Sequence, residues 1–227
     1  MNVIERTLNA IASFRFCLYF FTLKDALKRP IQIHWKTKVC IEKNTSIEIK
    51  SPLKTNMVKI GFTGAEYISS RQAIFVMKEG SKIIFENECE FGPGVIIYME
   101  KNSQMIIGDG LYANTNCTIR NTNRIVFEDH INIGWNSFIN TSDGHEVSID
   151  GFVKPHSGDI FIRRCVWITS NCTINKNTEI GAFSIVGQHS IVGKKFEQEH
   201  VLIAGCPAKV VKSNVLRLDK QQYEVQP

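Results

Sequence analysis

An aliphatic residue returns at every sixth position over much of the C-terminal half of the chain. The run comprises Ile162, Ile168, Ile174, Ile180, Val186 and Val192. Four residues after each of the first five lies a small or β-branched residue, namely Val166, Cys172, Thr178, Ser184 and Ser190. An α-helix would show a period of about 3.6, and an ordinary β-sandwich would alternate with period 2 between turns. A register of six therefore indicates short strands joined by corners.

Shorter runs extend this register upstream. They are Phe85, Phe91 and Ile97, then Ile107, Ala113 and Ile119, then Phe127, Ile133 and Ile139. A weaker pair, Ile41 and Ile47, predicts that the repeats begin before residue 60. Three such units make one triangular coil, with the large aliphatic residues inside and the small residues at the corners. Stacked coils satisfy one another's backbone groups, so we predict an all-β parallel β-helix. The alternative is simple alternation in another all-β domain.

The N-terminal segment, residues 1–30, is expected to be helical. Its apolar run Phe16–Leu23 is much shorter than the roughly 20 residues of a membrane span. We predict an amphipathic helix over about residues 2–28 that ends before Pro30. The favoured interpretation is packing on its own or a neighbouring subunit. The other is peripheral membrane contact through Lys24, Lys28 and Arg29.

Composition narrows the class of protein. Hydrophobic residues make up 43% and charged residues 22% of the 227 residues, as in ordinary folded domains. The net charge of +5 is spread without a basic stripe, so nucleic-acid binding is not expected. The seven cysteines are odd in number and lack CxxC spacing, which favours buried free thiols in a reducing compartment. We therefore expect a cytoplasmic protein, with the inner membrane surface as its second possible location.

Four segments carry a resemblance to a known family. They are "LYANTNCTI", "INTSDGHEV", the repeats "IRRCVWITSNCTINKNTEIGAFSIVGQHSIVGKK" and the tail "LIAGCPAKVVK". Over about residues 83–212 the chain resembles the hexapeptide-repeat O-acetyltransferases, in particular their maltose/galactoside branch. It is also similar to the capsule and polysaccharide O-acetyltransferases. The resemblance implies a left-handed parallel β-helix, here residues 31–206, followed by a C-terminal tail, residues 207–227. It also implies a homotrimer with active sites between subunits, acetyl-CoA as donor and a sugar hydroxyl as acceptor.

His145 is the candidate catalytic base. It follows the break in register after Ile139, so we expect an excursion loop over about residues 140–160. Imidazole titrates near neutrality, which suits removal of a proton from a sugar hydroxyl. The resemblance places the family's catalytic histidine at this position, whereas the alternative is a surface histidine in an Asp-Gly turn. Asp143 and Glu146 flank it and are candidates to orient the imidazole or bind the sugar.

The resemblance supplies two further site residues, and position along the repeats supplies the others. Asn114 is implied to hold the acceptor, and Trp167 to lie against the reactive end of the cofactor, where it is also a candidate to bind substrate. Ser170 is a candidate to stabilise the oxyanion through its backbone N–H. The candidates for cofactor contact are Ser170, Gln188 and Gly193 along the pantetheine arm, and Lys194, Lys195 and Lys212 at the phosphates.

Three positions depart from the family pattern. Thr169 stands where glycine is usual, Gln188 where a small residue is usual, and Cys206 where asparagine is usual. Three other functions stay open at this level. They are an N-acetyltransferase of a nucleotide-linked amino sugar, a non-catalytic β-helix binding subunit, and a zinc-dependent hydratase. The histidines show no evident arrangement for three-fold zinc ligation, so no metal is expected.

Overall fold

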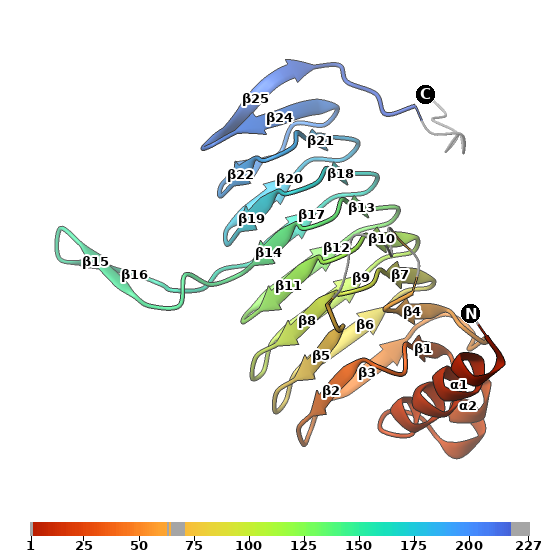
Figure 1. Cartoon of the computed structure of the whole chain (residues 1–227). Helices are drawn as coiled ribbons and strands as arrows, with labels where there is room; N and C mark the ends of the chain where they lie inside the picture. Colours follow the sequence, from red (N-terminus) through yellow and green to blue (C-terminus); the bar gives the residue numbers. More distant parts are fainter. Residues whose placement is uncertain (1, 63, 65–70, 219–227) are drawn as a thin grey trace.

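The computed structural model describes residues 2–62, 64 and 71–218, so residues 219–227 of the expected tail lie outside it. The chain winds into a three-sided prism of stacked coils, with helices at its N-terminal end (Figure 1). Each turn of the coil adds one strand to each of three parallel sheets, here named sheets A, B and C. The parallel β-helix predicted from the period of six is confirmed.

The strands fall into the three sheets in a regular rotation. Sheet A holds β1 (Ile31–Ile33), β4 (Val58–Ile60), β7 (Cys89–Phe91), β10 (Leu111–Ala113), β13 (Asn132–Ile133), β18 (Trp167–Ile168), β21 (Ile185–Val186), β24 (Val201–Gly205) and β25 (Ala208–Ser213). Sheet B holds β2 (Lys38–Ile41), β5 (Ile74–Met77), β8 (Ile96–Met99), β11 (Thr118–Asn121), β14 (Phe138–Asn140), β19 (Thr173–Asn175) and β22 (Ile191–Val192). Sheet C holds β3 (Ser46–Ile49), β6 (Lys82–Phe85), β9 (Gln104–Ile107), β12 (Arg124–Phe127), β17 (Ile160–Ile162), β20 (Thr178–Ile180) and β23 (Lys195–Phe196).

The core is the column of inward side chains that the register of six predicted. Ile162, Ile168, Ile174, Ile180, Val186 and Val192 are all fully buried, and so are the small residues four positions later. Left-handed backbone recurs at the residue just before each small one, at Cys165, Asn171, Asn177, Phe183 and His189. Asparagine tolerates this conformation better than most residues, which explains its frequency at the corners.

The N-terminal segment forms two helices, α1 (Val3–Cys17) and α2 (Leu23–Lys28), so the prediction of one helix over residues 2–28 is wrong. The interruption has a local cause. The side chain of Thr22 accepts a hydrogen bond from the Asp25 N–H at 3.3 Å, which caps a new helix. The sequence signal was Thr22 followed three residues later by an acid.

Helix α1 closes the open end of the prism. The Asn9 side chain accepts from the Trp35 N–H at 2.8 Å, and Ser13 Oγ accepts from the Ile33 N–H at 3.0 Å. Phe16 packs edge-on against Phe75, with ring centroids 5.1 Å apart. The opposite side of the helices exposes apolar residues, so membrane contact stays a prediction. No helix among the described residues is both long and apolar enough to cross a bilayer.

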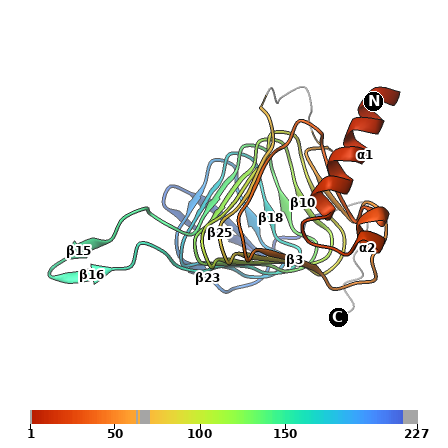
Figure 2. The ribbon, with the colours of Figure 1, turned by 90° about the horizontal axis from the view of Figure 1, so that it is seen from below.

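Two segments depart from the coil. Between β14 and β17 the chain leaves the vertex where sheets B and C meet and forms an antiparallel hairpin of β15 (Val147–Ile149) and β16 (Phe152–Lys154). This hairpin projects far from the prism (Figures 1 and 2). At the C-terminal end, β25 pairs antiparallel with β24 and closes sheet A. That pairing extends sheet A past residue 206, the end of the β-helix expected from the sequence.

Candidate functional site

A row of outward side chains crosses sheet A. Parallel pairing places Tyr112 beside Asn132, Asn132 beside Trp167, and Trp167 beside Ile185. Each stands one position before an inward residue of the core, so its side chain faces away from the prism. Trp167 is 38% exposed, between the buried Val166 and Ile168. The row brings residues of four successive coils onto one surface.

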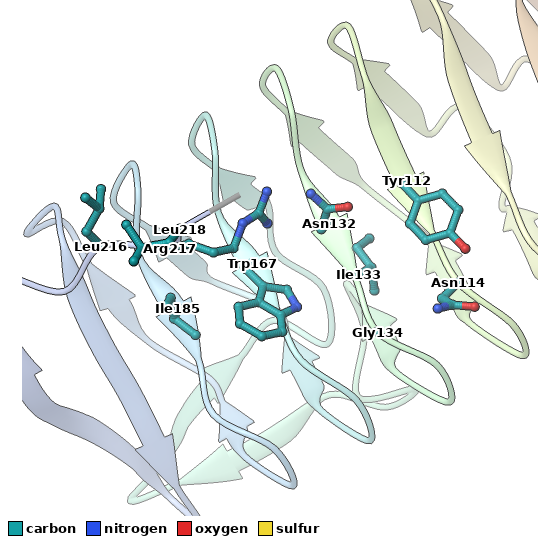
Figure 3. Close-up of a pocket in the computed structure, with 10 residues that line it drawn as sticks. All are labelled: Tyr112, Asn114, Asn132, Ile133, Gly134, Trp167, Ile185, Leu216, Arg217 and Leu218. Atoms are coloured by element: carbon teal, nitrogen blue, oxygen red, sulfur yellow. The ribbon is translucent and has the colours of Figure 1, made fainter. Parts of the chain in front are cut away.

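This row forms one wall of an open pocket of about 450 Å³. The lining residues are Tyr112, Asn114, Asn132, Ile133, Gly134, Trp167, Ile185, Leu216, Arg217 and Leu218 (Figure 3). Gly134 has no side chain to fill the space between Asn114 and Thr169, which occupy the same position in the coils before and after it. The pocket therefore has an aromatic side, an amide side and a floor of backbone.

Two polar groups mark the N-terminal end of the pocket. Asn114 begins the corner between sheets A and B, and its Oδ1 accepts from the Thr115 N–H at 2.7 Å. Tyr112 stands beside Glu90 in the row, and Glu90 pairs with Lys59 at 2.5 Å. Burial, and then the Glu90 charge, raise the pKa of the Tyr112 phenol above its usual value. Tyr112 is therefore a neutral O–H group near neutral pH, able to donate to a ligand.

Arg217 reaches the pocket from the C-terminal segment that follows β25. With the Asn132 amide oxygen turned toward it, both terminal nitrogens of the guanidinium donate to that oxygen at 2.9 Å. The same guanidinium lies 5.9 Å from the centre of the Trp167 ring. Sequence reasoning missed Tyr112, Asn132 and Arg217. Tyr112 and Asn132 occupy the same position in their repeats as Trp167, so the period of six could have identified them. No local pattern marks Arg217.

His145 lies on the excursion hairpin, away from this pocket. It is exposed in the turn that precedes β15, between Asp143 and Glu146, which are exposed as well. The base of the hairpin is tied down on both sides. Asp143 forms an ion pair with Lys176 at 2.7 Å, and Ser142 Oγ lies 3.1 Å from His156 Nδ1.

The predicted cofactor residues divide between two vertices of the prism. Ser170 and Gln188 lie in stacked corners between sheets A and B, where the His189 N–H donates to the Ser170 carbonyl at 3.3 Å. Gly193 and Lys194 lie between sheets B and C, the vertex from which the hairpin leaves, and Lys195 begins β23 there.

The three lysines do not converge in one chain. Lys194 lies 5.1 Å from the Phe196 ring centre, and Lys195 pairs with Glu179 at 3.6 Å. Lys212 lies instead on β25 of sheet A. Of the departures from the family pattern, Thr169 is accommodated by donating its hydroxyl to the Val186 carbonyl at 2.7 Å, and Gln188 is exposed.

Within one chain the predicted site is thus in two halves. One half, with Asn114, Trp167, Ser170 and Gln188, lies on sheet A and at its border with sheet B. The other half lies at the vertex between sheets B and C, from which the hairpin with His145 leaves, and where Gly193, Lys194 and Lys195 also lie. In a three-sided prism this vertex is opposite sheet A (Figure 2). In the described part of the chain, no group of three or more His, Cys, Asp or Glu is arranged to hold a metal ion.

Comparison with known proteins finds acetyltransferases among the chain's relatives. The chain is 29% identical over 173 residues to the galactoside O-acetyltransferase of Escherichia coli strain K12, covering 75% of this chain and 81% of that protein. The galactoside O-acetyltransferase of Lactococcus lactis is 29% identical over 119 residues, which are 52% of this chain and 56% of the relative. No protein-family model matches the chain.

Among solved structures, the polySia-specific acetyltransferase NeuO has the same fold. It superposes with a TM-score of 0.55 at 20% identity, over 84% of this chain and 92% of that one. The stacked triangular coils of this chain, predicted from its register of six, are thus found in a solved acetyltransferase as well. The chain is thus similar in sequence to galactoside O-acetyltransferases over most of its length, and it has the β-helix fold of the acetyltransferase NeuO.

Proposed function

We propose that this protein transfers an acetyl group from acetyl-CoA to a hydroxyl of a sugar, as part of surface polysaccharide or capsule synthesis. The reaction takes place in a site shared by two subunits of a homotrimer. One observation carries the proposal: His145 and the Asn114–Trp167 pocket lie on opposite sides of one chain. A second copy of the chain can supply the missing half, as closed symmetric assemblies commonly do.

The excursion hairpin supports a shared site. Its strands expose Val147, Ile149, Phe152 and Val153, and Phe152 is 74% exposed. The register places Val147, Ile149 and Phe152 on one face of the hairpin. An exposed apolar face on a projecting arm is typical of a surface that another protein covers. Since His145 precedes this arm directly, docking of the arm on a neighbouring subunit would carry the imidazole to that subunit's face.

The proposed reaction is a direct transfer. The Asn114 amide, which can donate and accept together, holds the acceptor hydroxyl. The His145 imidazole removes its proton as the oxygen attacks the thioester carbonyl of acetyl-CoA. The backbone N–H of Ser170 is our candidate to stabilise the resulting oxyanion. The thiolate of coenzyme A then leaves and takes the proton back from the imidazole, so no acyl-enzyme forms.

The residues around His145 take different roles in this proposal. Asp143 is engaged by Lys176 at 2.7 Å, and Lys176 also donates to the Pro155 carbonyl across the base of the hairpin. We therefore assign Asp143 to anchoring the hairpin rather than to orienting the imidazole. Glu146 stays a candidate for sugar binding. Gly193, Lys194 and Lys195 share the vertex from which the hairpin leaves, and we assign them to coenzyme A, with Gln188 and Lys212 contributed by the neighbour.

A cytoplasmic location completes the proposal, because acetyl-CoA is available there. The free state of all seven cysteines supports it, since thiols persist in a reducing compartment.

Mixed trimers provide the test. His145→Ala and Asn114→Ala are each expected to lose activity by about 10²-fold or more. When equal amounts of the two variants are denatured together and refolded, about one interface in four combines an intact hairpin with an intact pocket, given random assembly. Acetyl transfer should then recover to about a quarter of the wild-type rate.

The control is refolding of each variant alone, which should recover nothing. A mixture as inactive as its parents would show that the two residues do not act across subunits. Full activity in His145→Ala would remove the catalytic assignment. Treating the product with mild hydroxylamine separates an ester from the amide that an N-acetyltransferase would form.

A further inference from the structure

Helix α1 lies along the free edge of the first strand of the coil. β1 is the terminal strand of sheet A, so among the described residues one of its edges has no strand beside it. The Asn9 side chain and the Ser13 hydroxyl accept from the backbone N–H groups of Trp35 and Ile33, and both side chains are buried. The free edge of a terminal coil faces along the axis of the stack. The side of α1 opposite Asn9 and Ser13 therefore points away from the prism (Figure 1).

That outward side of α1 is apolar. Ile4, Ile11 and the C-cap residue Leu18 recur at about every second helical turn, so they share one face of the helix. These residues are 71%, 52% and 44% exposed. A surface helix normally turns charged and polar residues toward water. This apolar stripe therefore indicates a surface that an apolar partner covers.

The second helix extends the exposed apolar surface. Figures 1 and 2 show α2 beside α1 at the N-terminal end of the prism. Leu23 and Leu27 are one turn apart on α2, and each is 64% exposed. Tyr19, in the link between the helices, is 66% exposed. None of these side chains lines the Asn114–Trp167 pocket, so binding of a ligand there does not account for them.

Basic side chains accompany the apolar ones. Residues 2–29 contain five basic and two acidic residues, a net charge of +3. Arg15 follows Ile11 by one turn and so lies beside the apolar stripe, and Lys24 is exposed on α2. Neither Arg15 nor Lys24 forms an ion pair in the described part of the chain, whereas both acids are engaged at the N-terminal caps of the two helices. The surface therefore combines exposed apolar side chains with uncompensated positive charge.

We propose that helices α1 and α2 bind the surface of an anionic lipid bilayer. The outward apolar side chains enter the boundary between the headgroups and the acyl chains, and Arg15 and Lys24 lie among the anionic headgroups. The protein rests on the bilayer in this arrangement, since no helix of the described residues is long and apolar enough to span it. The inference goes beyond acetyl transfer and does not depend on it.

A second copy of the chain is the other partner that could cover these helices, and two arguments favour lipid. In a symmetric contact through this surface, Arg15 and Lys24 of one copy would meet those of the other, and like charges repel. The subunits of the homotrimer proposed above meet instead at the sides of the prism, where the pocket and the hairpin lie (Figure 2). The outward side of α1 faces along the axis of the prism and stays open in that assembly.

Flotation of the full-length protein with lipid vesicles provides the test. We expect binding to vesicles of phosphatidylcholine mixed with phosphatidylglycerol, and binding that is about tenfold or more weaker to vesicles of phosphatidylcholine alone. Ile11→Asp should weaken binding to the mixed vesicles about tenfold or more, because a charged group replaces an apolar contact. Lys24→Gln should weaken this binding severalfold, and a higher salt concentration should act in the same direction.

Two residues of β25, at the other end of the prism, supply the matched controls. Val211 is 54% exposed, against 52% for Ile11, so Val211→Asp makes the same kind of change on a comparable surface. Lys209→Gln matches Lys24→Gln, since both lysines are exposed. Both control variants should bind the mixed vesicles as the wild type does.

A wild type that stays unbound, that binds both kinds of vesicle equally, or that binds as well after Ile11→Asp would overturn the proposal. Leu27→Asp, on the other helix, repeats the test if the Tm of Ile11→Asp shows that this variant does not fold. A lower oligomeric mass of Ile11→Asp in sedimentation velocity, with no vesicle binding by the wild type, would assign the surface to a second copy instead. Because neither acetyl-CoA nor a sugar is present, failure of the acetyl-transfer proposal would be seen separately.

Discussion

Replacement of Gly134 by alanine tests how tightly the coils stack beneath the pocket. A Cβ atom at this position would lie 2.6 Å from the Ser170 nitrogen, 2.6 Å from the Thr169 carbonyl carbon and 2.7 Å from Ser170 Oγ. Ordinary van der Waals contact begins at 3.4 Å, so the neighbouring coil must move by about 0.8 Å. Two hydrogen bonds oppose this movement, from the Gly134 N–H to the Ile168 carbonyl at 2.7 Å and from the Asn171 N–H to the Trp135 carbonyl at 2.9 Å.

The expected loss of stability follows from these contacts. Overpacking costs about 1–3 kcal/mol, and two of the three overlaps here are with backbone atoms, so we expect about 3 kcal/mol. For a chain of this length, that lowers Tm by roughly 6–12 °C. Differential scanning calorimetry measures this decrease in Tm. Both proteins are scanned at one concentration, because the melting temperature of an oligomer depends on concentration.

Gly193→Ala is the matched comparison. The nearest atom to its added Cβ is 3.7 Å away, and its backbone lies outside the left-handed region. Alanine there restricts the unfolded chain and should stabilise by up to about 1 kcal/mol. A Gly134→Ala protein that melts within about 1 °C of the wild type, or an equal loss in Gly193→Ala, would refute the steric argument.

Two further predictions concern buried thiols and the hairpin. Burial raises the pKa of Cys117 from 9.0 to about 12, so the folded state is stabilised fully below pH 9 and loses this contribution as pH rises toward 12, at about 1.4 kcal/mol per pH unit. In urea unfolding, the free energy of unfolding should fall less between pH 8 and pH 10 in Cys117→Ala than in the wild type. An identical decrease in the two proteins would contradict this prediction. Phe152→Asp should dissociate the proposed trimer with the prism intact, and an unchanged sedimentation coefficient would exclude the hairpin from the interface.

The period of six predicted the fold well because burial leaves little choice at inward positions. Ile168, Ile174 and Ile180 are fully buried, as are the small residues that follow them. The prediction of helices was poorer at the N-terminus. There the hydrophobic pattern predicts one amphipathic helix, whereas Thr22 caps a second helix and divides the segment in two. A local side-chain hydrogen bond decided that boundary, and hydrophobic periodicity does not detect such bonds.

The site was harder to predict because its residues are far apart in sequence. Asn132 and Trp167 became visible as neighbours only after the strand register was known. Arg217 enters the pocket because β25 turns the chain back across sheet A. The break in register made His145 a candidate, and its catalytic role stays a prediction. Its separation from Asn114 within one chain follows from the sheets to which the neighbouring coil segments belong.

The hairpin shows how such a fold can gain chemistry without disturbing its core. From Ile133 to Ile168 the chain runs 35 residues, whereas from Ile168 to Val186 it runs 18, yet both pairs lie in register on sheet A. The extra residues leave the prism between β14 and β17 and return to the same ladder. Because each coil is bonded only to its neighbours, an insertion at a vertex changes no inward contact. The outward row and the insertions can therefore vary independently, and our proposal of a site shared between subunits depends on this independence.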